Sequence, residues 1–202
     1  MKLLSKKQLD EAALILKYGG LIAFPTETVF GFGVIYDNHE SYKRLIDVKR
    51  RPPEKPFTLM LSDIEDIDKY AYVDEKSRVL IRKFLPGQFT IILKAKENLP
   101  EFAVSKEGNV GIRIPDDEAI RNLIRKVGKP LLVPSANRSG EEPLHNSDDI
   151  IKEFDNEIDA VIKGESISNI PSTIVMVTDK IVLIREGLIK KADIDKALEE
   201  SL

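Results

Sequence analysis

The chain of 202 residues contains no cysteine and no tryptophan, and its only histidines are His39 and His145. The absence of cysteine excludes disulfides, thiolate nucleophiles and zinc sites with sulfur ligands. The two histidines lie far apart in the sequence and neither has a metal-ligand spacing, so we interpret each as a surface residue. A metal ion, if one takes part, is therefore expected to arrive bound to a phosphate-bearing ligand.

Long apolar runs and a strong excess of one charge are also missing. No uninterrupted apolar stretch is long enough to span a bilayer, and the Met-Lys-Leu-Leu start lacks the apolar core and cleavage site of a signal peptide. We therefore expect a cytoplasmic protein with no membrane contact. The formal net charge of −3 argues against a protein that coats nucleic acid through its overall charge.

The order of apolar and polar residues predicts alternating helices and strands. Ser5 and Gln8 have the spacing of a capping box before a first helix, which Gly19 and Gly20 would end. Further helices are expected at 39–48, 75–84, 116–127 and from 190 onward, and strands at 21–24, 57–61, 89–93, 110–114, 131–133, 159–162, 173–177 and 181–184. The last two strands should form a hairpin, so the pattern predicts an α/β fold with a mixed parallel and antiparallel sheet and flanking helices. We find no repeat, low-complexity tract or linker, so residues 1–202 should form one domain.

The segment from Lys49 to Pro56 gathers four cations beside three prolines. Proline fixes its own φ and pushes the preceding residue toward extended geometry, so Arg51 and Lys55 should be held out of a helix. One interpretation is a rigid cationic loop that binds an anion. The other is a solvated charge run that ends a helix and faces its negative C-terminal dipole. The segment alone leaves both open.

Three other places carry small polar residues next to apolar strands, where α/β folds put ligand contacts. They are Pro25-Thr26-Glu27-Thr28-Val29-Phe30-Gly31-Phe32-Gly33, Val133-Pro134-Ser135-Ala136-Asn137-Arg138-Ser139-Gly140, and Pro171-Ser172-Thr173 together with Arg185-Glu186-Gly187. Hydroxyl and amide side chains can bind phosphate or carbonyl oxygens without adding charge. Each segment is also consistent with ordinary turn chemistry.

Familiar catalytic motifs are absent from the sequence. No Gly-x-x-x-x-Gly-Lys-Ser/Thr occurs, Gly31 and Gly33 lack a third glycine at Tyr36, and neither histidine has a serine partner in a nucleophile-elbow context. The chemistry that remains is electrostatic, with anion binding and charge neutralisation in place of covalent catalysis.

Six segments, taken in order, resemble the YrdC-type family of threonylcarbamoyl-AMP synthases in its single-domain form. They are Pro25 to Gly31, Lys49-x-Arg51-Pro52-x-x-Lys55-Pro56, Gly111 to Pro115, Pro134-Ser135-Ala136-Asn137-x-Ser139-Gly140, Ser172 to Val175, and Ile184-Arg185-x-Gly187. Three positions depart from the family pattern: Phe30 replaces a usual tyrosine, Gln88 interrupts a Pro-Gly-Pro, and Met60 stands where many members carry histidine.

The resemblance implies a single YrdC-like catalytic domain over residues 1–202, with a twisted mixed sheet and a positively charged concave cavity. It implies a nucleotidyltransferase that makes L-threonylcarbamoyl-AMP and pyrophosphate from L-threonine, bicarbonate or CO2, and ATP. Mg²⁺ would come with the nucleotide. The product would pass to a tRNA threonylcarbamoyl transferase complex for the threonylcarbamoyladenosine modification of tRNA, and this chain would bind tRNA weakly at most.

The resemblance also implies functional residues, position by position. The catalytic group would be Lys49, Arg51, Ser135 and Asn137. ATP would contact Arg51, Lys55, Asn109, Ser135 and Arg185. Threonine would contact Thr28, Arg113 and Ser172, with Arg113 on its carboxylate, and no residue is implied as a metal ligand.

Two other functions compete with this interpretation. A basic concave surface could hold RNA without catalysis, but the acidic composition and the lack of aromatic residues interleaved with the cationic loop count against it. The same fold also carries out O-carbamoyl transfer in a hydrogenase-maturation protein. That relative has additional zinc-finger segments, which the absence of cysteine here disfavours.

Overall fold

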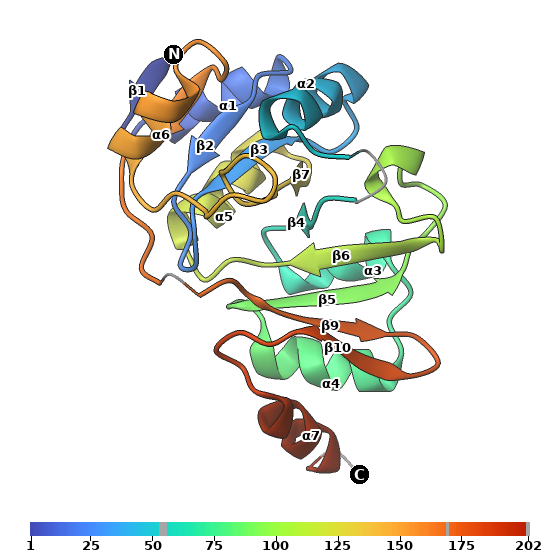
Figure 1. Ribbon diagram of the computed structural model, residues 1–202. Helices are drawn as coiled ribbons and strands as arrows, with labels where there is room; N and C mark the ends of the chain where they lie inside the picture. The colour runs from blue at the N-terminus through green and yellow to red at the C-terminus, as the bar shows by residue number, and fades with distance from the viewer. Residues whose placement is uncertain (53–55, 169, 201–202) are drawn as a thin grey trace.

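A computed structural model of the chain describes residues 1–52, 56–168 and 170–200. Its centre is a mixed sheet of ten strands in the order β1-β8-β2-β3-β7-β4-β6-β5-β9-β10 (Figure 1). The strands are β1 (Lys2–Leu4), β2 (Ile22–Phe24), β3 (Gly31–Ile35), β4 (Leu59–Met60), β5 (Phe89–Lys94), β6 (Asn109–Arg113), β7 (Leu131–Leu132), β8 (Ala160–Ile162), β9 (Thr173–Val177) and β10 (Ile181–Arg185). The N-terminus lies beside β1, and the C-terminus lies beyond β10 at the opposite edge (Figure 1).

The helices are α1 (Leu9–Lys17), α2 (His39–Lys49), α3 (Ile67–Tyr70), α4 (Glu75–Phe84), α5 (Glu118–Val127), α6 (Ser147–Phe154) and α7 (Lys191–Glu199), with short 3-10 turns η1 (Ile64–Asp66) and η2 (Glu101–Ala103). Side-chain caps fix the starts of four of them. Asn38, Asp74, Asp117 and Asn146 each accept a hydrogen bond from a backbone N–H in the first turn. These caps satisfy donors that a helix start otherwise leaves unpaired.

The half of the sheet that contains β1, β8, β2, β3 and β7 is covered on both faces. The apolar faces of α1 and α5 pack on one side, where they bury Ile22 and Phe24 of β2. On the other side α2 and α6 pack over Ala23 of β2 and Phe32 of β3. Both faces of these strands are therefore apolar, and their sequence reads as continuous hydrophobic runs.

The other half, β4, β6, β5, β9 and β10, has a different construction. Along β5, Phe89, Ile91 and Leu93 join the core that contains Leu80 and Ile81 of α4. Thr90 and Ile92 point to the opposite face, because side chains alternate along a strand. That second face forms the floor of a cavity.

The sequence predicted most of these elements, and the predicted mixed sheet with flanking helices is confirmed. The predicted hairpin is β9 and β10, which pair antiparallel around 178–180. The predicted capping box forms only in part: Gln8 Oε1 accepts from the Ser5 N–H as in a capping box, but the Ser5 hydroxyl donates to the same oxygen and does not accept from a backbone N–H. Helix α1 begins only at Leu9, with Gln8 as its N-cap. Strands β1 and β3, helices α3 and α6, and the turns η1 and η2 were not predicted.

Among the described residues, no helix is both long and apolar enough to cross a membrane.

Candidate functional site

A cavity of about 420 Å³ opens on the uncovered face of β5, β6 and β9. Seven residues implied by the resemblance line it together: Thr28, Arg51, Asn109, Arg113, Ser135, Ser172 and Arg185. They come from segments up to 157 positions apart, the span from Thr28 to Arg185. Lys49 and Asn137 do not line the cavity, and Lys55 lies outside the described residues.

The floor of the cavity is made by alternate residues of three neighbouring strands. Thr90 and Ile92 of β5 stand beside Ile174 and Met176 of β9, with which they pair in parallel register. On the other side of β5, Gly111 of β6 pairs with Ile92. Because Gly111 has no side chain, it leaves room for a ligand above the centre of the floor.

Arg51 enters the cavity because α2 ends abruptly before it. Arg50 takes a left-handed conformation (φ 49°) as the C-cap, and the Arg51 N–H donates to the Ile46 carbonyl. The Arg51 guanidinium then lies over the Phe57 ring, 4.9 Å from its centroid, and donates to the Pro56 carbonyl. Partial burial lowers the pKa of Arg51. The backbone thus leaves the helix where the sequence predicted.

Lys49 is buried behind the cavity wall, in contact with the loop after β7. Its Nζ donates to the carbonyl oxygens of Ser135 (2.6 Å) and Asn137 (2.9 Å) and to Asn137 Oδ1 (3.1 Å). Ser135 Oγ also donates to Asn137 Oδ1, at 2.6 Å, and Asn137 Nδ2 donates to the carbonyls of Arg138 and Glu141. Lys49 and Asn137 therefore hold the loop that presents Ser135.

The charge of Lys49 is costly in this position. Burial lowers the pKa of Lys49 to about 7, and the nearby charge of Arg51 adds to the effect. The three oxygens around Nζ can only accept, so all three hydrogen bonds need the protonated ammonium with its three N–H groups.

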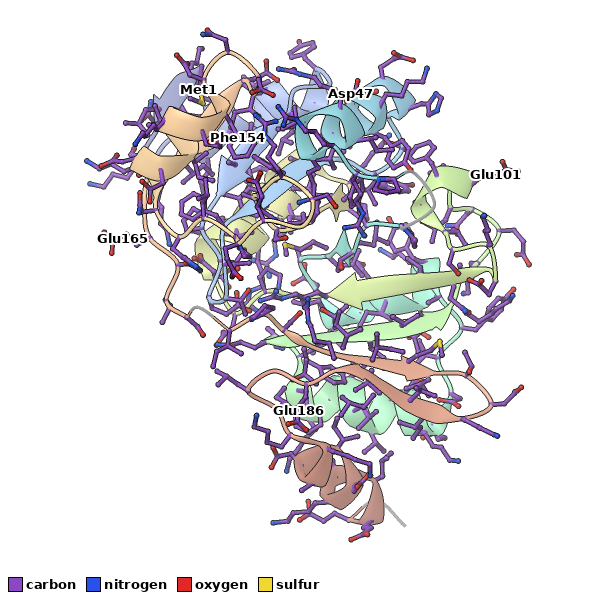
Figure 2. All side chains as sticks on the ribbon, in the orientation of Figure 1. Met1, Asp47, Glu101, Phe154, Glu165 and Glu186 are labelled. Carbon is purple, nitrogen blue, oxygen red and sulfur yellow. The ribbon has the colours of Figure 1, made fainter. Side chains whose placement is uncertain are left out.

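Arg138 strengthens the same junction, although it was not among the residues selected from the sequence. Its guanidinium donates to the Val48 carbonyl at the end of α2 and to both carboxylate oxygens of Glu157. It also lies over the ring of Phe154 of α6, which is labelled in Figure 2. This ring packs edge-on against Phe32 of β3. No local signal marks it in the sequence, because Val48 and Glu157 lie 90 and 19 positions away.

At one end of the cavity, Arg113 forms an ion pair with Glu27. Arg113 Nη2 lies 2.8 Å from Glu27 Oε1 and 3.0 Å from Thr28 Oγ1, and both ion-pair partners are over nine-tenths buried. Glu27 Oε1 also accepts from the Asp116 N–H. Among the described residues, Arg113 Nε has no partner. The sequence had not singled out Glu27.

Arg185 forms hydrogen bonds with Ser172 beside the Arg113–Glu27 ion pair. Arg185 Nε donates to the Ser172 carbonyl (2.9 Å) and Nη2 to the Ser172 hydroxyl (3.2 Å), which also bonds to Thr90. Partial burial lowers the pKa of Arg185, and the charge of Arg113 lowers it further. Gly187 allows this approach, because a Cβ there would lie 2.4 Å from the Pro171 carbonyl oxygen.

The cavity lining has three arginines and, among the described residues, a single carboxylate, Glu107. No group of three or more His, Cys, Asp or Glu side chains in the described part of the chain could hold a metal ion. The lining thus offers cations, hydroxyls and amides to a ligand, but no cluster of metal ligands. Whether the cavity as a whole is positively charged stays a prediction.

Residues 14–187 match the model of the Sua5/YciO/YrdC family, which is described as "Telomere recombination". The chain belongs to this family. A putative threonylcarbamoyl-AMP synthase of Methanocaldococcus jannaschii is 39% identical over 186 residues, which cover 91% of this chain and 87% of the relative. The threonylcarbamoyl-AMP synthase of Bacillus subtilis is 33% identical over 95% of this chain but only 56% of its own length.

Solved structures of Sua5/YciO/YrdC members have the same fold. Sua5 of P. abyssi in complex with L-threonine superposes with a TM-score of 0.92 at 27% identity, over 98% of this chain. The chain spans 61% of that protein's length. YciO of E. coli gives a TM-score of 0.86 at 25% identity, over 94% of this chain and 97% of the other. HypF, at 21% identity and a TM-score of 0.77, shares the fold alone.

Proposed function

We propose that the protein is an L-threonylcarbamoyladenylate synthase, which converts L-threonine, bicarbonate or CO2, and ATP into threonylcarbamoyl-AMP and pyrophosphate. The observation that carries this proposal is the convergence of seven of the implied residues on one cavity. Relatives named threonylcarbamoyl-AMP synthase at 39% and 33% identity support it.

In the proposed reaction, the amine of threonine is first carboxylated and the new carboxylate then attacks the α-phosphorus of ATP. The bond from that phosphorus to the bridging oxygen breaks, and pyrophosphate leaves. Two anions must meet in this step, so positive groups that screen and align them would supply most of the catalysis. Arg51 and Arg185 are the cations we assign to this task, with Lys55 as a further proposed contact.

The remaining nucleotide contacts are polar. We assign Asn109 and Ser135 to ATP, and the hydroxyl proton of Ser135 is already donated to Asn137. Ser135 would therefore meet the nucleotide as an acceptor, for example of a ribose hydroxyl. Lys49 and Asn137 would act through Ser135, because they hold its loop and do not line the cavity.

Mg²⁺ would arrive with the phosphates of ATP. The lone carboxylate of the described lining, Glu107, does not make a cage for the ion by itself, which fits a metal held mainly by phosphate oxygens and water. At the other end of the cavity, Arg113 would bind the threonine carboxylate, and Thr28 and Ser172 would contact the rest of the amino acid.

We further propose that the protein acts in the cytoplasm and passes its product to a tRNA threonylcarbamoyl transferase complex. The chain itself should bind tRNA weakly, since its formal net charge is −3. A protein whose main ligand were RNA would instead show an affinity that falls steeply with salt.

Pyrophosphate release from ATP tests the proposal. Release should depend on both L-threonine and bicarbonate, and mass spectrometry should detect threonylcarbamoyl-AMP. ATP binding by calorimetry should strengthen when threonine is present. Release that is independent of threonine, or tight tRNA binding without ATP binding, would refute the synthase assignment and favour the competing functions.

A further inference from the structure

A chain of hydrogen bonds joins Arg113 to four polar groups: those of Glu27, Thr28, Thr26 and the Val29 carbonyl. The direction of each of these bonds can be assigned. Thr26 Oγ1 lies 2.7 Å from the Val29 carbonyl oxygen, which can only accept, so the single hydroxyl proton of Thr26 is donated there. Thr26 Oγ1 also lies 2.9 Å from Thr28 Oγ1. With the Thr26 proton engaged, Thr28 must be the donor in that contact.

At the other end of this hydrogen-bond chain, Arg113 fixes the directions of the remaining hydrogen bonds. Arg113 can only donate, and the two protons of its Nη2 go to Glu27 Oε1 (2.8 Å) and Thr28 Oγ1 (3.0 Å). Thr28 Oγ1 therefore accepts from Arg113 and donates to Thr26. The directions of both threonine hydroxyls therefore follow from two fixed roles: the Val29 carbonyl can only accept and Arg113 can only donate.

These hydrogen bonds determine which donors and acceptors remain for a ligand. Thr26 Oγ1 donates once and accepts from both the N–H and the hydroxyl of Thr28, so it has no capacity left, although it lines the cavity. Thr28 keeps one lone pair and no free proton. Among the described residues, two buried atoms of the ion pair have no partner: Arg113 Nε, a donor, and Glu27 Oε2, an acceptor.

We propose that Thr26 and Glu27 are positioning residues that set the hydrogen-bond polarity at this end of the cavity. Arg113 presents a donor to the carboxylate of an amino acid, while Thr28 presents only an acceptor to a neighbouring ammonium or hydroxyl group. The site therefore favours a ligand that carries a hydrogen-bond donor next to a carboxylate. This proposal rests on the proposed function for the identity of the amino acid, but not for the polarity itself.

Substitution of Thr26 by valine or by serine tests the assignment. Valine has nearly the shape of threonine but cannot receive the Thr28 proton, which is then free to point at the ligand. Serine keeps the hydroxyl and should behave as the original residue. Ser41→Ala is the matched control, because it removes a buried hydroxyl that donates to the Gly19 carbonyl, away from the cavity.

The measurement is titration calorimetry of the whole chain with L-threonine, O-methyl-L-threonine and ATP. In Thr26→Val we expect affinity for L-threonine to fall by about tenfold, the scale of one hydrogen bond to a charged group, with ATP affinity unchanged. Thr26→Ser and Ser41→Ala should bind all three ligands as the unmodified chain does, while melting temperatures report any loss of fold.

O-methyl-L-threonine shows which donor of the ligand contacts Thr28, its hydroxyl group or its ammonium group. If the ligand hydroxyl meets Thr28, the ether should bind poorly to the unmodified chain and better, relative to threonine, to Thr26→Val. If the ammonium meets Thr28, both ligands should lose affinity equally in that variant. Either result supports the proposal.

Three results would overturn the proposal. The first two are a Thr26→Val chain that binds L-threonine with normal affinity, and one that loses as much affinity for ATP as for L-threonine. The third is a Thr26→Ser chain that loses as much affinity for L-threonine as Thr26→Val does. Normal threonine-dependent pyrophosphate release together with these results would leave the proposed function standing. Conversely, the expected binding pattern without pyrophosphate release would refute only the proposed function.

Discussion

The Lys49 ammonium lies within hydrogen-bond distance of both oxygens of Asn137, and the same Asn137 side-chain oxygen accepts from Ser135. A buried charge thus supports a loop that faces the cavity, without reaching the cavity itself. Lys49 is described better as a positioning group than as one that touches a ligand.

The pKa of Lys49 leads to a prediction about stability and pH. In the folded chain this pKa is lowered from 10.5 to about 7, so between these values the unfolded chain binds more protons. The free energy of unfolding should therefore rise with pH across that window, by at most about 1.4 kcal/mol per pH unit. Lys49→Met should lack this contribution.

Urea unfolding of both chains from pH 6.5 to 10 measures the effect. The stability of the unmodified chain relative to Lys49→Met should increase with pH, whereas the exposed Lys7→Met should show no such trend. A pH-independent difference between the unmodified chain and Lys49→Met would show that the ammonium keeps an ordinary pKa despite its burial.

Arg51→Ala should lower the rate of synthesis while leaving the fold intact. Loss of a charge-assisted phosphate contact in a site with little water costs on the order of 2 to 4 kcal/mol, or about 30- to 1000-fold. Steady-state kinetics and thermal unfolding provide the two readouts. Arg82→Ala, an exposed arginine on α4, is the control and should be neutral. Near-normal turnover of Arg51→Ala would remove this arginine from the mechanism.

Glu27→Gln should reduce both stability and threonine binding. Arg113 would be left as an uncompensated buried charge, and breaking such a pair costs about 3 to 5 kcal/mol. Replacing both partners, as Glu27→Gln with Arg113→Met, should recover most of the stability but not the affinity for threonine. Chemical denaturation and calorimetry distinguish the two effects. If the double variant bound threonine normally, the ion pair would be purely structural.

Serine should be a detectable but poor substrate. It lacks one methyl group, and a methyl in an apolar environment gives about 1 to 3 kcal/mol of discrimination, or about 10- to 200-fold. Val29, Met60 and Ile92 are apolar side chains in the lining that could contact such a methyl. The ratio of kcat/KM for threonine and serine checks this, and equal values would contradict it.

The sequence predicted elements well where one local pattern decides them. Helix α4 was predicted with its observed bounds, 75–84, since Asp74 caps it and its apolar residues recur at helical spacing. Strand β1 was missed because only three residues pair with β8, which follows about 160 positions later. Pairing between such distant segments leaves no local trace.

The same distinction applies to the site. The loops with Arg51, Ser135 and Ser172 stood out by composition, and the structure brings them together. Glu27 and Arg138 were not singled out, because their importance depends on partners more than 15 residues away in the chain, Arg113 and Glu157. A buried ion pair cannot be recognised from one of its members alone.

The alternation on β5, β6 and β9 also affects how this protein can change. Ile92, Gly111 and Met176 face the cavity, whereas Ile91, Ile112 and Val175 on the same strands face the core. Substitutions at the first three positions can reshape the ligand space while the packing beneath α4 keeps its composition. Ligand preference and thermal stability should therefore be able to vary separately on these strands, which gives related chains room to acquire different substrates on one scaffold.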